Sequence, residues 1–159
     1  MTRPTPIDEE VFYDGRVMIT ETDANGRITY VNRKFIEMSG YDKEELIGQP
    51  HSIMRHPDMP KCCFKNMWET IKKNETWKGY VKNLRKDGAY YWVVVYVSPK
   101  TDEEGNTVGY IAARKIPEQL TLKEIKAKYG DLINLEQCKG EEDEAFISNI
   151  MGEEMVEVL

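Results

Sequence analysis

The chain has 159 residues, of which 28 are Asp or Glu and 22 are Lys or Arg, so its formal net charge at pH 7 is −6. This length fits one domain with a single core. The acidic balance argues against a nucleic-acid-binding protein, because the molecule as a whole repels a phosphate backbone. No apolar run reaches the roughly 20 residues that span a bilayer, and the first residues lack the apolar stretch of a secretory signal. We therefore expect a cytoplasmic protein without direct membrane insertion.

The pattern of apolar and turn-forming residues predicts an alternation of short strands and helices. Runs rich in β-branched and aromatic residues, separated by turn sequences such as Asn25-Gly26 and Asp87-Gly88, predict strands. Apolar residues at helical spacing predict helices. In chain order, the expected elements are strands at 17–22 and 27–31, helices at 33–39 and 42–46, loop or single helical turns at 48–60, a longer helix, strands at 77–85, 90–97 and 107–115, and a helix at 118–129.

The longer helix carries an apolar stripe. Its apolar residues between Phe64 and Ile71 fall at positions i, i+3, i+4 and i+7, which places them on one inward face. Asp58 is the expected N-cap, with Pro60 in the first turn. The whole order of elements predicts an α+β fold, in which a single antiparallel sheet has helices gathered on one face and encloses a pocket.

Several motifs between residues 15 and 116 resemble the PAS fold family. They are Asn32, Ser39-Gly40-Tyr41, Glu45-Leu46-Ile47-Gly48 and the stretch from Asn83 to Gly88. The resemblance implies a PAS fold with a five-stranded antiparallel sheet. It also implies three parts: an N-terminal cap at 1–14, a PAS sensor domain at 15–117 and a C-terminal helical extension at 118–159.

A second set of motifs resembles the flavin-binding sensor of bacterial aerotaxis receptors. These motifs are Gly48 to His51, Met54 to Pro60, Met67-Trp68 and Tyr91-Trp92-Val93. In that family FAD lies between the sheet and the helices, and its redox state sets the signal to the chemotaxis machinery. Matching positions imply six FAD-binding residues here, which are Asn32, His51, Arg55, Asp58, Trp68 and Asn83, with Trp77 as a further candidate.

The chemistry of three of these residues suits a flavin. The Asn83 amide both donates and accepts, so it can pair with the flavin N5 atom in either redox state by turning over. Arg55 can clamp a phosphate bidentately, and Trp68 can pack against the ring. The alternative roles are structural: a bond from Asn83 to a neighbouring loop, an ion pair between Arg55 and Asp58, and core packing for Trp68.

The expected output is a protein partner. The sequence lacks the membrane anchors and methyl-accepting signalling domain that usually follow this type of sensor. It is similar to the stand-alone PAS subunit of bipartite energy-taxis systems, which implies signalling in trans to a membrane-bound methyl-accepting chemotaxis-type receptor. We also expect a homodimer. The apolar residues of 145–159 fall at roughly helical spacing, so this tail is either a docking helix or simply a frayed terminus.

Two alternatives to a flavin sensor remain open. A haem-binding PAS gas sensor would need an axial histidine, for which His51 and His56 are the only candidates. A cofactor-free PAS module would use its sheet face and terminal helices for protein association alone. No nucleophile–base pair, phosphate loop or paired-carboxylate pattern predicts an enzyme, and the three cysteines have no CxxC spacing that predicts a metal site.

Overall fold

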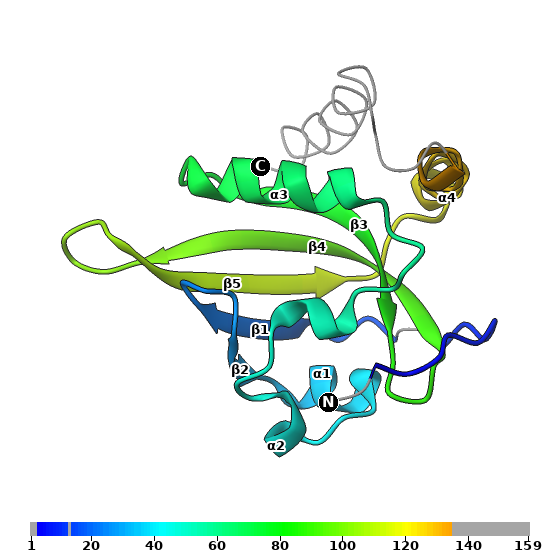
Figure 1. The fold of residues 1–159 in the computed structure, drawn as a ribbon, viewed down its shortest axis with the longest axis horizontal. Helices are drawn as coiled ribbons and strands as arrows, with labels where there is room; N and C mark the ends of the chain where they lie inside the picture. Colours follow the sequence, from blue (N-terminus) through cyan, green and yellow to red (C-terminus); the bar gives the residue numbers. More distant parts are fainter. Residues whose placement is uncertain (1–2, 13, 135–159) are drawn as a thin grey trace.

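The computed structural model describes residues 3–12 and 14–134. Five strands form one antiparallel sheet in the order β2-β1-β5-β4-β3, which confirms the predicted α+β fold (Figure 1). The strands are β1 (Met18–Asp23), β2 (Ile28–Val31), β3 (Trp77–Leu84), β4 (Tyr90–Thr101) and β5 (Thr107–Lys115). The helices are α1 (Arg33–Ser39), α2 (Lys43–Leu46), the 3-10 turn η1 (His51–Met54), α3 (Lys61–Lys72) and α4 (Gln119–Asn134).

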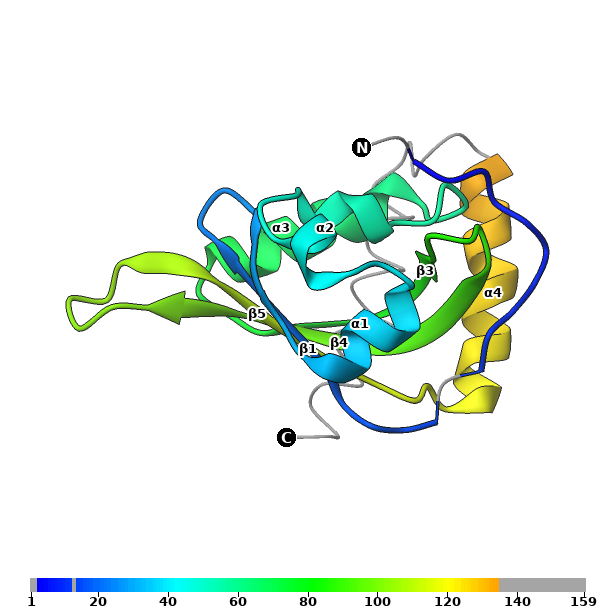
Figure 2. The same cartoon turned by 90° about the horizontal axis from the view of Figure 1, so that it is seen from below.

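The helices that precede β3 cover one face of the sheet. α1 packs against β1, α2 against β2, and α3 against β3 and β4. Seen from below, α2 and α3 lie on the same side of the sheet, whereas α4 lies at its far end beside β3 (Figure 2). Within the described residues, no helix is long and apolar enough to cross a membrane.

α3 begins later than expected, at Lys61. Pro60 occupies the N-cap position with ψ at 137°, so it lies before the helix and not in its first turn. The predicted capping role of Asp58 is wrong: its backbone N–H donates to His56 Nδ1 at 3.0 Å, and its carboxylate lies 3.1 Å from Lys82 Nζ. A residue that precedes proline is biased towards extended backbone, which keeps Met59 out of the helix and moves the helix start away from Asp58.

β4 and β5 form a hairpin that extends beyond the rest of the sheet (Figure 1). β4 continues to Thr101, four residues past the predicted end, although Pro99 interrupts its hydrogen-bonding pattern. Proline is tolerated there because β3 begins at Trp77, opposite Val97, so among the named strands only β5 pairs with β4 at Pro99. The turn at 102–106 carries three acidic residues and lies far from the helices.

The N-terminal segment runs along the turn between β3 and β4. The Ile7 N–H donates to the Gly88 carbonyl at 2.9 Å, and the Val11 N–H donates to the Tyr90 carbonyl at 2.7 Å. Gly88 has φ at 90°, and a Cβ atom there would lie 2.3 Å from the Thr5 carbonyl oxygen. Glycine is therefore needed at this turn both for its backbone conformation and for the close approach of the N-terminal segment.

α4 is longer than the predicted helix at 118–129. Its residues Leu122 and Ile125 are buried, and Lys126 lies 3.5 Å from the Glu10 carboxylate of the N-terminal segment. The N-terminal segment and α4 therefore meet through side chains. The predicted tail helix at 145–159 lies outside the described residues.

Candidate functional site

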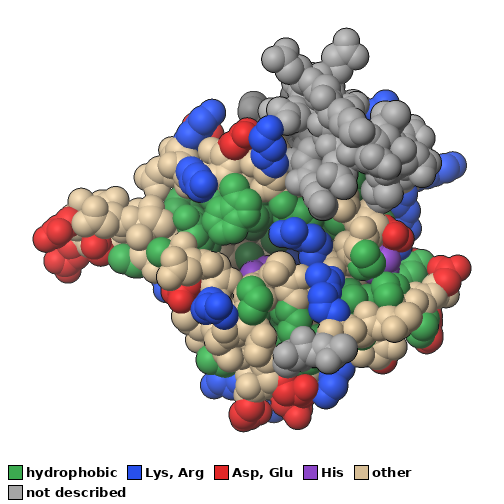
Figure 3. Space-filling view, viewed as in Figure 1, with side chains coloured by type: hydrophobic (Ala, Val, Ile, Leu, Met, Phe, Trp, Pro, Cys, Tyr) green, Lys and Arg blue, Asp and Glu red, His purple; other side chains and the backbone are tan. Residues whose placement is uncertain are grey.

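A cavity of about 390 Å³ lies between the sheet and α3. This volume is within the range of small-molecule pockets, roughly 300–1,000 Å³. Its sheet wall uses every second residue of the strands, because alternate side chains share a face. These wall residues are Thr20 and Thr22 of β1, Trp77, Val81 and Asn83 of β3, Val95 and Val97 of β4, and Tyr110, Ala112 and Arg114 of β5. Figure 3 shows a hollow in the molecular surface, with hydrophobic side chains around it and a histidine visible inside.

The opposite wall comes from α3 and the loop before it. The apolar stripe predicted for this helix lines the cavity, and it consists of Phe64, Met67, Trp68 and Ile71. The half-buried Trp68 ring meets the Tyr110 ring edge to face, with 5.6 Å between their centroids. The helix and the sheet therefore touch through aromatic side chains at one end of the cavity.

Arg114 brings a buried positive charge to the cavity. Its side chain is only 2% exposed. Its Nη1 atom donates to Thr20 Oγ1 at 3.1 Å, and its Nη2 atom lies 2.8 Å from His51 Nε2. The guanidinium carbon also lies 5.0 Å from the centroid of the Phe35 ring, on the side of α1. Thr20, His51 and Phe35 together hold the charged group in place within the sheet wall.

The same contacts fix the protonation of His51. A guanidinium group only donates hydrogen bonds, so Nε2 must be the acceptor and Nδ1 carries the proton of a neutral imidazole. Burial, followed by the charges of Arg114 and Arg55, lowers the pKa of His51 to about 3. The imidazole therefore stays neutral at physiological pH, and Arg114 is the charged member of the pair.

Arg55 lies at the cavity wall with its Nε atom buried. Within the part of the chain that the structure describes, its buried Nε atom has no hydrogen-bond partner. The guanidinium carbon lies 3.6 Å from the centroid of the Phe64 ring, and burial lowers the pKa of the group. An unpaired buried donor is costly, because it has lost its water without gaining a partner. The position suits an acceptor atom of a bound molecule.

Asn83 lies close to Arg55. The two residues form an isolated antiparallel bridge between the loop and the edge of β3. The Asn83 side chain is 5% exposed, and its Nδ2 atom donates to the Tyr91 hydroxyl at 3.4 Å. Burial raises the pKa of Tyr91, so its hydroxyl stays protonated. This part of the cavity therefore offers an amide and a guanidinium side by side.

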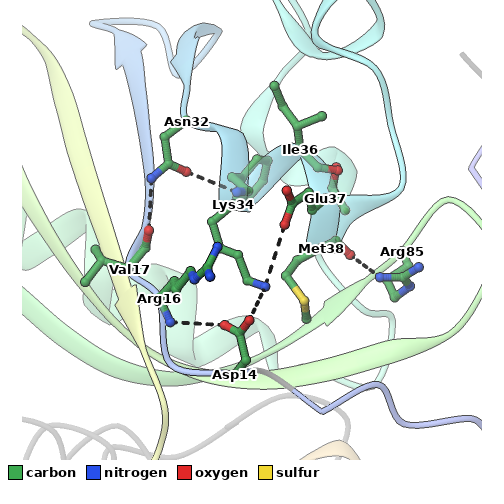
Figure 4. A network of polar contacts seen from close by, with 11 residues as sticks. Asp14, Arg16, Val17, Asn32, Lys34, Ile36, Glu37, Met38 and Arg85 are labelled. Atoms are coloured by element: carbon green, nitrogen blue, oxygen red, sulfur yellow. Dashed lines mark hydrogen bonds and ion pairs between the residues drawn. The ribbon is translucent and has the colours of Figure 1, made fainter.

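Two of the six predicted site residues do not line the cavity. Asn32 caps α1: its Oδ1 accepts from the Phe35 N–H at 3.0 Å, and its Nδ2 donates to the Val17 carbonyl at 2.9 Å (Figure 4). Asp58 is exposed and pairs with Lys82. The structure brings His51, Arg55, Trp68 and Asn83 together around the cavity, along with the further candidate Trp77.

The two histidines differ in what they offer a metal ion. His51 faces the cavity, but its Nε2 is occupied by Arg114. His56 is 3% exposed, does not line the cavity, and accepts the Asp58 N–H with its Nδ1. An axial bond to haem would therefore require His51 to give up its contact with a buried cation. In residues 3–12 and 14–134, no group of three or more His, Cys, Asp or Glu side chains is placed to hold a metal ion.

Comparison with known proteins gives consistent matches. The model of a family described as the PAS fold matches residues 28–114. The chain is 46% identical over 101 residues to the aerotaxis receptor of Escherichia coli (strain K12), a match that covers 64% of this chain and 20% of the receptor. The match thus spans about a fifth of the length of this receptor, and the same share of a nitrogen fixation regulatory protein of Klebsiella pneumoniae, which is 30% identical over 99 residues (62% of this chain).

Solved structures of similar fold include PAS and light-oxygen-voltage domains. A PAS domain from Colwellia psychrerythraea superposes with a TM-score of 0.60 at 25% identity, covering 65% of this chain and 87% of that one. A light-oxygen-voltage domain studied with a flavin analogue gives a TM-score of 0.61 at 21% identity, covering 74% of this chain and 89% of that one. At this identity the second likeness concerns the fold alone.

Proposed function

Because this chain belongs to the PAS fold family, we propose that its cavity binds a flavin, FAD, and that the domain senses redox or energy state through it. The observation that carries the proposal is the buried Nε of Arg55, a donor at the cavity wall to which the described residues supply no acceptor. A phosphate oxygen would satisfy this donor, and the fork of the guanidinium suits bidentate contact. The similarity to a protein named an aerotaxis receptor supports a redox input.

The rest of the cavity fits the ring of a flavin. Its walls are mostly aliphatic and aromatic, as a flat apolar ring requires, with a few polar groups to orient it. A bound flavin would supply reversible electron transfer, and the protein supplies orientation and electrostatics. Arg114 would present a positive charge to a ring held in the cavity, which gains negative charge on reduction, and Asn83 would offer it an amide that can donate or accept.

An absorption spectrum of freshly purified protein tests this proposal. We expect flavin bands that bleach with dithionite and return in air, and chromatography of the heat-released ligand should identify FAD rather than FMN.

Arg55→Lys keeps the positive charge but removes the guanidinium Nε donor, so it should lower the FAD content of the purified protein several-fold. Arg33→Lys, the same substitution at an exposed position of α1, is the matched control and should leave the FAD content unchanged. A colourless wild-type protein that does not bind added FAD or FMN would contradict the proposal and favour a cofactor-free interaction module.

We further propose that the domain is a cytoplasmic homodimer that signals in trans to a membrane-bound methyl-accepting chemotaxis-type receptor. Support comes from the similarity to a protein named an aerotaxis receptor, 20% of whose length the match covers. The net charge of −6 suits a partner with a basic surface. Light scattering of the flavin-bound protein should give a dimer mass, and a monomer mass would contradict this part of the proposal.

Deletion of 145–159 tests the route to the receptor. If this tail docks on the partner, the shortened chain should lose co-purification with the cytoplasmic part of a co-expressed methyl-accepting receptor and keep its flavin. Loss of flavin would refute a role confined to docking. Unchanged co-purification would assign the contact to another surface.

A further inference from the structure

Two arginine side chains lie together at an opening of the cavity. Arg55 lines the cavity and is half-buried, and Ser52 of the same loop also lines it and is exposed, so the cavity reaches the surface here. Arg3 of the N-terminal segment is exposed, and its Nη2 atom donates to the Arg55 carbonyl. Burial lowers the pKa of Arg55, and the nearby charge of Arg3 lowers it further, because like charges repel. Figure 3 shows Lys and Arg side chains beside the hollow.

No acid of the described chain neutralises these two cations. In residues 3–12 and 14–134, neither Arg3 nor Arg55 forms an ion pair with Asp or Glu. Asp58 lies in the same loop as Arg55, but its carboxylate is 3.1 Å from Lys82 Nζ and pairs with that residue. Adjacent like charges without a counter-ion raise the free energy of the folded protein, and an anion beside both of them removes this cost. The chain has a net charge of −6, so an excess of basic residues does not explain the pair.

Contacts farther along the N-terminal segment hold Arg3 in this position. The Tyr90 N–H donates to the Glu9 carbonyl at 2.9 Å, and Glu10 forms an isolated parallel bridge with Tyr90. The Glu10 carboxylate lies 3.5 Å from Nζ of Lys126 on α4. The segment is therefore attached to β4 and α4 at one end, and at the other end Arg3 reaches the loop that lines the cavity.

We propose that Arg3 and Arg55 together form a diphosphate site at the opening of the cavity, so that the N-terminal segment is part of the ligand-binding site. The identity of the diphosphate as that of FAD rests on the function proposed above. A cavity of about 390 Å³ is near the lower end of the range for small-molecule pockets, so the phosphates of a dinucleotide would lie at its opening and the ring inside. Each guanidinium can bind phosphate oxygens through two N–H groups. Arg3 therefore selects a flavin with a diphosphate over flavins with one phosphate or none.

Titration of the flavin-free protein with three flavins tests the role of Arg3. Lumiflavin is the ring without phosphate, FMN carries one phosphate, and FAD carries a diphosphate. Arg3→Gln should weaken FAD binding by about tenfold, FMN binding by less, and lumiflavin binding by no more than about twofold, because only the phosphates meet this side chain. Arg33→Gln, the same substitution at an exposed position of α1, is the matched control and should leave all three affinities unchanged. Unchanged FAD affinity in Arg3→Gln, or an equal loss for lumiflavin, would overturn the proposal.

Hydrogen exchange of the N-terminal segment gives a second readout, which does not depend on affinity. Saturating FAD should slow exchange of the Ile7 and Val11 amides, which donate to the Gly88 and Tyr90 carbonyls, because a ligand bound to Arg3 holds the segment against these partners. Saturating lumiflavin should not slow it, and Arg3→Gln should abolish the effect of FAD. Equal protection by FAD in the wild type and in Arg3→Gln would show that the segment is not part of the site.

The two proposals fail in different ways. Wild-type protein that binds lumiflavin and FAD, but whose FAD affinity and amide exchange do not depend on Arg3, would refute the diphosphate site and leave the flavin function standing. Wild-type protein that binds none of the three flavins would refute the function proposed above, and the diphosphate site with it.

Discussion

Replacing Arg114 with methionine is expected to lower the midpoint potential of the bound flavin by on the order of 100 mV. Reduction adds negative charge to the ring, and the buried guanidinium is the positive charge within the sheet wall of the cavity. For a one-electron couple, about 60 mV corresponds to a tenfold change, so 100 mV corresponds to about 2 kcal/mol. A desolvated unit charge several ångströms away supplies an energy of this size at an effective dielectric constant of about 20.

Arg114→Lys separates charge from geometry. Lysine keeps the positive charge but cannot donate to both Thr20 and His51 with the fixed fork of arginine, so its potential should lie between those of the wild type and the methionine variant. The measurement is a dye-coupled spectroscopic titration of all three proteins, together with flavin content and unfolding midpoint. Identical potentials for wild type and Arg114→Met, with flavin still bound, would mean that Arg114 does not sense the charge on the ring.

Acidification from pH 6.5 to pH 4 is expected to lower the free energy of unfolding by up to about 3 kcal/mol through His51 alone. Its pKa is about 3 in the folded protein against an ordinary value of 6.5. Above pH 6.5 the imidazole is neutral in both states and contributes no pH dependence. Between these values only the unfolded chain takes up the proton, so stability falls as pH falls, by at most about 1.4 kcal/mol per pH unit.

His51→Gln isolates this contribution. Glutamine keeps an oxygen that can accept from Arg114 and Thr20 but does not titrate. Other groups act in the same direction, because burial also lowers the pKa of His56, and ion pairs lower the pKa of the Asp14 and Glu45 carboxyls. Urea unfolding of the flavin-free proteins at a series of pH values should therefore show a shallower slope for the variant between pH 4 and 6.5. Parallel slopes would show that His51 accepts a proton in the folded state.

The order of elements could be predicted from the sequence because local signals agree with the final fold. Turn sequences such as Asn25-Gly26 separate the strands, and the left-handed Gly40 ends α1 as predicted. The ends of elements were harder to predict where tertiary contacts decide them. β4 continues through Pro99 because β5 is the one described strand that pairs with it there, which no local pattern reveals. Asp58 pairs with Lys82, a residue of a strand distant in sequence, instead of capping α3.

The candidate site was predicted only in part, for a related reason. The loop residues and the helical stripe carry distinctive patterns, and both line the cavity. Arg114 was missed, although it lies on the same face of β5 as Tyr110 and Ala112, which also line the cavity. β5 has apolar residues on both of its faces, so its sequence does not indicate which face points into the cavity. Asn32 was expected at the cofactor, but a polar residue before a helix also serves as its cap, and the structure shows that role.

The extended hairpin of β4 and β5 provides an attachment point for a reporter. Beyond Val97 and before Gly109 these two strands pair only with each other among the named strands, so a change at their turn need not propagate into the sheet. A Cβ atom on Gly105 would meet nothing within 4 Å. Exposed tips of this kind tolerate insertions best. A spin label or fluorophore placed near 103–104 would therefore measure the distance between two copies, or between this domain and a receptor, without touching the cavity whose state it reports.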